Sequence, residues 1–394
     1  MELTKKQQEA LKITIDRYKA GEKYTVISGY AGAGKSTVVK YIISALCNDA
    51  DLEPAEDVAY CAFTGKAASI LGQKGCPNAI TAHKLLYDAR PMPNGTFKFF
   101  PKGEIEYSIV VVDECSMLPK TMVDQLLKYS YTYIIFCGDP GQLPPINKDQ
   151  DNHLLDHPHV FLDEIMRQAA DSGIIQLSMK IRNGEPIDGF KSDDALVIPK
   201  RELVDGMLTW SDIVLSATNA TRIALNTQIR SMYNFNAPIV ENEKIICLNN
   251  YWDIASDKGN ALTNGCIGYL TNFFEGKQVY PDYLGGSIIT CNGNFNSEYG
   301  DKFDSLSIDK EGIITGKPAL DGKTKYKIGR IKKYKDTIPL EFTYGYVITG
   351  HKAQGSQWNK VLVIEEKFPF DKEEHKKWLY TCVTRASEKV VLVR

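Results

Sequence analysis

The segment that most constrains this chain is a glycine-rich loop that joins an apolar run to an amphipathic one. Residues 29–36 read GYAGAGKS and follow the apolar run YTVISG at 24–29. Glycines let the backbone curl so that its N–H groups face a phosphate at the positive end of the next helix. In this strand-to-helix setting, the G-x-x-x-x-G-K-S spacing predicts a P-loop nucleotide site. A glycine-rich turn before a helix is the alternative.

The predicted phosphate site has a role for each polar side chain of the loop. We expect Lys35 to neutralise the β- and γ-phosphates of ATP, and the Ser36 hydroxyl to ligate Mg²⁺. The residues expected to bind the nucleotide here are Gly29, Gly32, Ala33, Gly34, Lys35, Ser36 and Thr37.

Two carboxylates and a glutamine follow later predicted strands. Asp113 and Glu114 close the run SIVVVDE, and carboxylates at the carboxyl end of a parallel strand project into the ligand crevice. We expect Asp113 to hold the hydration shell of Mg²⁺ and Glu114 to accept a proton from the attacking water. Gln142, in GDPGQ, follows the next strand and would sense the γ-phosphate. A solvated strand end and a plain turn are the respective alternatives.

The chain alternates short β-branched runs with amphipathic stretches in two regions, which predicts an α/β fold with parallel sheets covered on both faces. Two stretches interrupt the pattern: one carries an Asn94-Gly95 hairpin signal, and the other is rich in Gly, Asn and Tyr without a convincing helix. We expect a first α/β domain at 1–87 and 107–165, a hairpin insert at 88–106, a second α/β domain at 166–262 and 337–394, and a small all-β barrel insert at 263–336.

Composition excludes several classes of protein. The 47 basic and 49 acidic side chains give a net charge of −2, so any nucleic-acid site must be a local groove. Nine cysteines without a C-x-x-C pair argue for a reducing cytoplasm rather than a disulfide framework or a zinc module. The start MELTKKQQEA has no apolar signal core, and no apolar run approaches the roughly 18 residues of a membrane span.

Eight motifs in order resemble those of superfamily 1B DNA helicases of the RecD-like and Dda type. They are LTKKQ, GYAGAGKST, AFTGKAA, TAHKLL, VVDECSML, GDPGQLPPI, ITGHKAQGS and LYTCVTRAS. The resemblance implies two RecA-like domains and an enzyme that uses ATP and Mg²⁺ to move 5′ to 3′ on single-stranded DNA and unwind duplexes. A translocase that unwinds poorly, or an ATPase subunit of a repair or replication complex, is the alternative.

The resemblance also implies partners and a setting. We expect single-stranded DNA and single-strand/duplex junctions as substrates, single-stranded-DNA-binding or replication proteins as partners, and no membrane. A cytoplasmic monomer in a bacterial cell, cellular or phage-encoded, is the expected form.

Three further residues take nucleotide roles from this resemblance. Gln7, in LTKKQ, would recognise the adenine edge. Arg167 and Arg385 would reach across the cleft between the RecA-like domains as arginine fingers, so that hydrolysis requires a closed cleft. Gln142 would link the γ-phosphate to the second domain. For both arginines the alternative is a structural or surface charge.

The motifs that match DNA-contacting segments carry hydroxyl, histidine and lysine side chains, which suit backbone phosphates and read no bases. They are Thr64, Lys66, Thr81, His83, Thr349, His351, Lys352 and Ser356. A purely structural role is the alternative for His83.

Aromatic and basic residues of the two inserts are further DNA candidates. Phe97, Phe99 and Phe100 would form a strand-separating wedge, or else a hydrophobic cluster that holds the hairpin. The barrel insert is short for this family, without an obvious long arm. Lys323, Lys325 and Lys327 would share one strand face along a DNA path, or else form a solvated surface.

Overall fold

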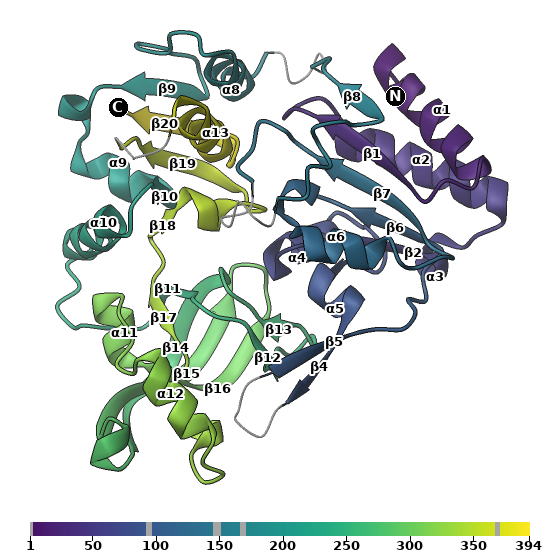
Figure 1. Cartoon of the computed structure of the whole chain (residues 1–394). Helices are drawn as coiled ribbons and strands as arrows, with labels where there is room; N and C mark the ends of the chain where they lie inside the picture. The colour runs from purple at the N-terminus through teal and green to yellow at the C-terminus, as the bar shows by residue number, and fades with distance from the viewer. Residues whose placement is uncertain (1–2, 92–96, 145–150, 166–170, 367–370) are drawn as a thin grey trace. The chain divides into compact units, whose positions relative to one another are not determined.

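The computed structural model describes residues 3–91, 97–144, 151–165, 171–366 and 371–394. The chain divides into two compact units, and Figure 1 follows it from the N- to the C-terminus. Unit 1 comprises residues 1–86, 101–217 and 349–394; unit 2 comprises residues 87–100 and 218–348.

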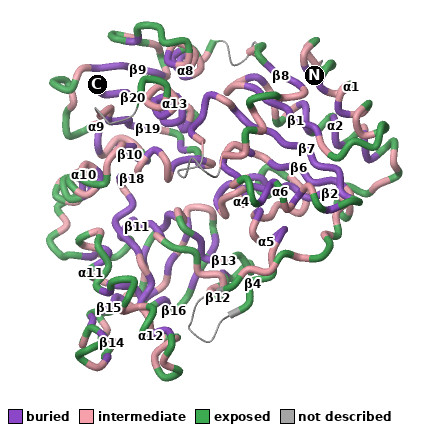
Figure 2. Tube along the Cα trace, viewed as in Figure 1, coloured by how far each residue is buried: buried purple, intermediate pink, exposed green. Residues whose placement is uncertain are grey.

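The first part of unit 1 is a parallel sheet in the order β3-β2-β6-β7-β1-β8. Its inner strands are buried on both faces, as their Val- and Ile-rich sequences require, and Figure 2 colours them as buried. The strands are β1 (Tyr24–Gly29), β2 (Val58–Ala62), β3 (Ile80–Thr81), β6 (Ile109–Val112), β7 (Tyr133–Gly138) and β8 (Val160–Leu162). The helices are α1 (Lys5–Lys19), α2 (Lys35–Ala50), α3 (Pro54–Asp57), α4 (Gly65–Gln73), α5 (Ala82–Leu86), η1 (Cys115–Met117) and α6 (Lys120–Leu126).

The first helix, α1, begins with a capping box. The Thr4 hydroxyl accepts the Gln7 N–H at 3.3 Å, and the Gln7 side chain accepts the Thr4 N–H at 3.1 Å. Apolar residues of α1, α2 and α4 then pack on one face of the sheet in a single core cluster. The P-loop follows β1 and precedes α2, which confirms the predicted strand-to-helix setting.

The second part of unit 1 contains strands of a sheet in the order β18-β10-β19-β20-β9, in which β10, β19, β20 and β9 run parallel. The strands are β9 (Ala195–Ile198), β10 (Ile213–Ser216), β18 (Val347–Thr349), β19 (Trp358–Ile364) and β20 (Ala386–Val393), with β18 at the boundary of the unit. The helices are α8 (Gly173–Asn183), η3 (Lys200–Glu202), α9 (Asp205–Trp210), η6 (Gly350–Ala353) and α13 (Lys372–Val383). Two parallel α/β layers confirm the predicted fold class.

Unit 2 is built on an antiparallel sheet in the order β16-β15-β14-β11-β17. Phe295, Phe303 and Phe342 are the largest fully buried side chains of its core. The strands are β11 (Glu243–Cys247), β12 (Tyr251–Ala255), β13 (Ala261–Leu262), β14 (Ile267–Val279), β15 (Ser287–Ser297), β16 (Lys302–Asp309) and β17 (Phe342–Tyr344), and the hairpin strands are β4 (Tyr87–Pro91) and β5 (Phe97–Pro101). The helices are α10 (Asn219–Met232), η4 (Asp282–Leu284), α11 (Lys310–Thr315), α12 (Gly322–Gly329) and η5 (Lys335–Thr337).

The insert of unit 2 differs from its prediction in three respects. It contains the helices α11 and α12, because Asp309 and Asp321 each cap a first turn by accepting a backbone N–H three residues on. Its sheet includes β11 and β17, which lie before and after the expected insert at 263–336 and pair with each other, and β11 also pairs with β14. The other boundaries remain a prediction.

The third difference is a long ribbon. The β14–β15 ladder runs from Gly268↔Ser297 to Val279↔Ser287, well beyond the residues that β11 pairs with. We call the part of this ribbon beyond Thr271, together with residues 280–286 and α12, the arm. The expectation of a short insert without a long arm was wrong, because strand length cannot be read from a segment rich in glycine and asparagine.

Candidate functional site

The phosphate loop has the backbone that an anion site needs. Gly32 and Gly34 have φ angles of 79° and 76°, in the left-handed region that favours glycine. Gly34 is the N-cap of α2 and provides no side-chain cap to its first turn. Lys35 Nζ donates to the carbonyls of Gly29 and Tyr30 at 2.7 and 3.1 Å, which holds the ammonium over the loop. A phosphate group fits this place, because it would accept from the uncapped N–H groups and from Lys35.

Gln7 lies against the same loop. Its side chain is buried, and Nε2 donates to the carbonyl of Ala33 at 3.5 Å. The structure thus brings Gln7 to the phosphate loop, while its role toward adenine remains a prediction.

The two carboxylates lie at the end of β6. Glu114 has a φ angle of 50°, and its Oε1 accepts from Gln142 Nε2 at 3.3 Å, so the structure brings these two predicted site residues together. In the described part of the chain, Glu114 Oε2 and Gln142 Oε1 are buried without a hydrogen-bond partner. Such acceptors suit a bound water or the water shell of a cation.

Electrostatics set Asp113 apart from an ordinary surface carboxylate. Burial, and then the charge of Glu114, raise the pKa of Asp113 to about 6, although Lys35 opposes the shift. An excess of negative charge in this place favours a cation. The described residues contain no group of three or more His, Cys, Asp and Glu side chains that would enclose a metal. Ser36 and Asp113 fit Mg²⁺ instead, since this ion keeps most of its waters and needs few protein ligands beside phosphates.

Tyr380, which the sequence analysis did not single out, connects both nucleotide loops to α13. Its hydroxyl donates to Asp139 Oδ2 at 2.7 Å and accepts the Ala31 N–H at 2.9 Å. The ring lies so close to Gly141 that a Cβ there would be 2.9 Å from Tyr380 Cε1. Asp139 also accepts the Gly141 N–H, and its burial raises its pKa. The only signal in the sequence is the tyrosine within LYTCVTRAS.

A second set of bonds runs beside Tyr380. The Leu143 N–H donates to Thr381 Oγ1 at 3.0 Å, and Gln354 Nε2 donates to the Leu143 carbonyl at 2.7 Å. The loop after β7 is thus fixed by residues of both late motifs of the chain.

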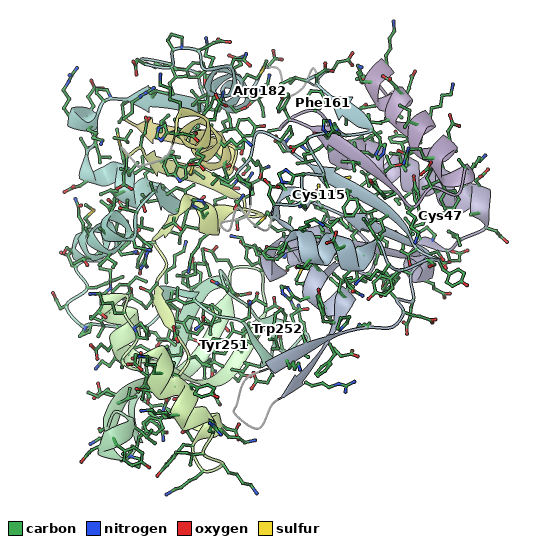
Figure 3. All side chains as sticks on the ribbon, in the orientation of Figure 1. Cys47, Cys115, Phe161, Arg182, Tyr251 and Trp252 are labelled. Carbon is green, nitrogen blue, oxygen red and sulfur yellow. The ribbon has the colours of Figure 1, made fainter. Side chains whose placement is uncertain are left out.

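A cation–π contact also reaches the phosphate loop. The Arg182 guanidinium lies 3.6 Å from the ring centroid of Tyr30, and Phe161 packs edge-on against the same ring at 5.1 Å. Figure 3 labels Arg182 and Phe161 on their elements, α8 and β8. The sequence analysis missed both, because Tyr30 occupies a variable position of the loop motif.

Of the two predicted arginine fingers, the structure describes only Arg385. Arg167 lies outside the described residues. Arg385 is buried, and its guanidinium donates to the Thr381 carbonyl, the Ser356 carbonyl and Thr384 Oγ1 at 3.0 to 3.3 Å. None of the bonds of the described residues joins Arg385 to Lys35 or Glu114, so its role as a finger stays a prediction.

The predicted DNA motifs around residues 64 and 356 meet in unit 1. Lys66 is buried with Nζ 3.7 Å from the ring centroid of Trp358. Gly355 has a φ angle of 69°, and a Cβ there would lie 3.2 Å from Thr64 Oγ1. Thr64 itself caps α4 by accepting the Ala67 N–H. Ser356 follows Gly355, and its carbonyl accepts a hydrogen bond from the Arg385 guanidinium.

The other DNA candidates occupy helix starts. Thr81 accepts the Lys84 N–H at 3.2 Å, and His83 packs on Phe63. Thr349 precedes η6, which carries His351 and Lys352. Burial lowers the pKa of both His83 and His351, so these imidazoles are neutral donors and acceptors near pH 7.

The hairpin forms as predicted, but its aromatic residues are already engaged. Phe99 packs edge-on against Tyr87 and against Trp252, at centroid distances of 6.3 and 5.6 Å. Arg90 and Lys98 lie over the ring of Phe100. The side chain of Phe97 and the turn lie outside the described residues, and the wedge stays a prediction.

None of the helices described in the structure combines the length and the apolarity that crossing a bilayer requires.

Replacing Asp113 with Asn will change stability in a pH-dependent way. The raised pKa means that the folded state binds the proton more tightly, so wild-type stability falls as pH rises from about 3.8 to about 6. Without Mg²⁺ or nucleotide, Asp113→Asn should therefore raise the free energy of unfolding by on the order of 2 kcal/mol at pH 8 and by much less at pH 4. Denaturant unfolding at both pH values measures this, and an equal effect at both would contradict the assignment.

Replacing Tyr380 with Phe removes only the hydroxyl between Asp139 and Ala31. We expect a loss of about 1–3 kcal/mol in the free energy of unfolding, because a buried carboxylate loses a donor. Tyr133→Phe is the matched control, since its buried hydroxyl bonds Thr25 and the Thr14 carbonyl elsewhere in the same unit. Both variants should lose stability, but only Tyr380→Phe should weaken nucleotide binding in a titration with a fluorescent ATP analogue. Equal affinities for the two variants would refute the role given to Tyr380.

Comparison with known proteins agrees with this geometry. An AAA domain profile matches residues 2–196, and a UvrD-like helicase C-terminal domain profile matches residues 344–393. The ATP-dependent RecD2 DNA helicase of Deinococcus radiodurans is 26% identical over 377 residues, which cover 94% of this chain and 47% of that protein. The chain thus spans less than half of that relative.

Two further comparisons extend over the whole chain. The ATP-dependent DNA helicase dda of Enterobacteria phage T4 is 23% identical over 444 residues, covering 100% of this chain and 99% of that protein. The Pif1 helicase from Bacteroides in complex with ADP-AlF3 and ssDNA has a similar fold, with a TM-score of 0.54 and 16% identity over 100% of this chain and 92% of that one. By its two domain profiles and its relatives, the chain is a superfamily 1B helicase of the RecD- and Dda-like type, and the Pif1 structure shares its fold.

Proposed function

We propose that the chain is an ATP-dependent DNA helicase that moves 5′ to 3′ on single-stranded DNA and opens duplexes ahead of it. One observation carries this proposal. The nucleotide loops of the first sheet are bonded to α13 through Tyr380 and Thr381, so the two α/β layers share the nucleotide site. A site shared in this way can convert ATP hydrolysis into movement of one layer against the other.

The residues around the loop divide the chemistry of hydrolysis among them. Lys35 and the N–H groups of the loop bind the triphosphate, and Gln7 contacts the base. Ser36 and Asp113 would hold Mg²⁺, which neutralises charge on the phosphates. Glu114 orients a water molecule and accepts its proton, with Gln142 fixing the carboxylate. Arg167 and Arg385 stabilise the charge that develops in the transition state once the layers close.

The same two layers carry the DNA motifs, which supports coupling between hydrolysis and strand movement. Thr64 and Lys66 lie on the first layer, and Gly355 and Trp358 on the second, with the motifs in contact. A strand bound across both motifs by Thr64, Lys66, Thr81, His83, Thr349, His351, Lys352 and Ser356 would be advanced whenever the layers shift. These contacts address phosphates, so movement is independent of sequence.

The substrate is inferred from the named relatives, and the direction from the resemblance of the motifs to superfamily 1B. The Deinococcus and phage proteins are named as DNA helicases, and the Bacteroides structure holds single-stranded DNA. The second candidate is a translocase with weak unwinding. The packing of Phe99 between Tyr87 and Trp252 favours it, because a ring engaged in this way is not free to stack on an opened base.

Unwinding of two tailed duplexes tests the proposal. Duplexes with a 5′ or a 3′ single-stranded tail should be separated only when the tail is 5′, and a protein-blocked strand without duplex tests translocation alone. Lys35→Ala should reduce unwinding by about 10²-fold or more, because a charge aimed at the transferred phosphate is lost. Lys40→Ala is the control, since Lys40 lies exposed on the same helix. Activity of Lys35→Ala, or a preference for the 3′ tail, would contradict the proposal.

A further inference from the structure

Residues 323–335, which begin in α12 of the arm and extend beyond it, concentrate positive charge that the composition of the chain conceals. Seven of the thirteen residues 323–335 are Lys or Arg and none is acidic, whereas the whole chain has a net charge of −2. The sequence analysis expected Lys323, Lys325 and Lys327 to share a strand face. That expectation was wrong, since these residues lie in α12, where consecutive residues are about 100° apart around the axis.

The helix sorts these cations into two faces. Lys323 lies three and four residues before Tyr326 and Lys327, which in turn lie four and three residues before Arg330, so the four share one helix face, and all four side chains are exposed. We call these four residues the basic stripe. On the other side, Ile328 is fully buried and Lys325 is ion-paired with Glu341. The structure thus separates a cation that anchors the helix from three that face outward.

The basic stripe rests on a rigid support. Ile328 packs with Tyr280, Leu284, Ile288 and Leu320 in a small core at the end of the β14–β15 ribbon. Asp321 caps the helix by accepting the Thr324 N–H, and the Tyr280 hydroxyl donates to the Thr337 carbonyl at 2.7 Å. The stripe is therefore held in place before any ligand arrives, which lowers the entropic cost of binding.

The outward charges form no ion pair among the described residues, and an acidic group beside them is Asp321, whose pKa the hydrogen bond from Thr324 and the charge of Lys323 help to lower. In the part of the chain that the structure describes, the ion pairs of this segment join Lys325 to Glu341 and Lys335 to Asp336, and none includes a cation of the stripe. The Arg330 guanidinium lies 5.8 Å from the ring centroid of Tyr326, so the aromatic ring supports a charge of the stripe itself. Three close like charges on one helix face repel one another, and a polyanion would relieve this repulsion.

We propose that the basic stripe binds the sugar–phosphate backbone of duplex DNA. Duplex DNA has the highest charge density of the nucleic acids that the chain would meet, about one negative charge per 1.7 Å of axis. Single-strand sites usually combine a basic groove with aromatic platforms, whereas here the cations lie on an exposed helix, whose one aromatic side chain, Tyr326, lies near the Arg330 guanidinium. The stripe provides three phosphate contacts and no base readout, so binding is independent of sequence.

This contact deepens the proposed function, since it gives the enzyme a grip on the duplex besides its grip on the single strand. It requires neither ATP nor the nucleotide loops. Binding can therefore be measured without nucleotide, and ATP turnover on single-stranded DNA reports separately on the motor.

The test compares two triple variants of the full chain by fluorescence anisotropy with a blunt duplex and with an oligo-dT strand, over a range of salt. The stripe variant is Lys323→Gln/Lys327→Gln/Arg330→Gln, which keeps Ile328 and the Asp321 cap. The control variant is Lys191→Gln/Lys258→Gln/Lys302→Gln, which removes the same charge from three exposed lysines outside residues 323–335. Circular dichroism and thermal unfolding check that both variants fold.

The stripe variant should bind the duplex about tenfold or more weakly at low salt, and the plot of log K against log salt should become shallower by about 2.7, for three phosphates lost. Its affinity for oligo-dT and its single-strand-stimulated ATP turnover should equal those of wild type. Unchanged duplex binding, an equal loss in the control, or a loss confined to oligo-dT would each overturn the inference. If wild type itself shows no ATP turnover with single-stranded DNA, the proposed function is refuted. The duplex-binding measurements then test the basic stripe independently.

Discussion

One hydroxyl group joins both nucleotide loops of the first α/β layer of unit 1 to the second layer. Tyr380 donates to Asp139 and accepts from Ala31, so a single side chain of α13 holds the loop before α2 and the loop after β7 at the same time. Both bonds are buried, where a lost partner is costly, and Gly141 is required because the ring occupies the place of its side chain. Besides burial, the nearby charges of Lys35 and Glu114 act on the pKa of Asp139, and Gln142 donates to Glu114, so the residues proposed to bind the nucleotide gather around this point.

The nucleotide site concentrates ionisable groups that are expensive to bury. Asp113, Glu114 and Asp139 lie near Lys35, and burial raises the pKa of both aspartates. A protein gains no stability from such a cluster of acids, and well-packed apolar residues would serve a purely structural purpose better. The cost is understandable if the cluster holds a cation and a water molecule during hydrolysis. The buried Lys66 beside Trp358 has the same character on the side of the DNA motifs.

Much of unit 1 could be predicted from sequence, because its determinants are local. The glycines at 32 and 34 require positive φ, the apolar runs are long enough for buried strands, and Thr4 and Gln7 form their capping box within four residues. Tyr380 and Arg182 could not be found in this way, since their partners lie about 350 and 150 residues away in the chain. In unit 2 the Lys residues of KTKYK alternate like a strand, but the Asp321 cap and the burial of Ile328 make a helix more stable.

In the proposed mechanism, ATP hydrolysis and strand movement both depend on the contact between the two α/β layers. ATP turnover in the presence and absence of single-stranded DNA tests this most directly. Because a strand bound across both layers would favour their closure, turnover should rise at least about tenfold when the strand is added, which corresponds to about 1.4 kcal/mol of coupling. A rate that single-stranded DNA leaves unchanged would show that the nucleotide site works without the DNA motifs, and would contradict the account.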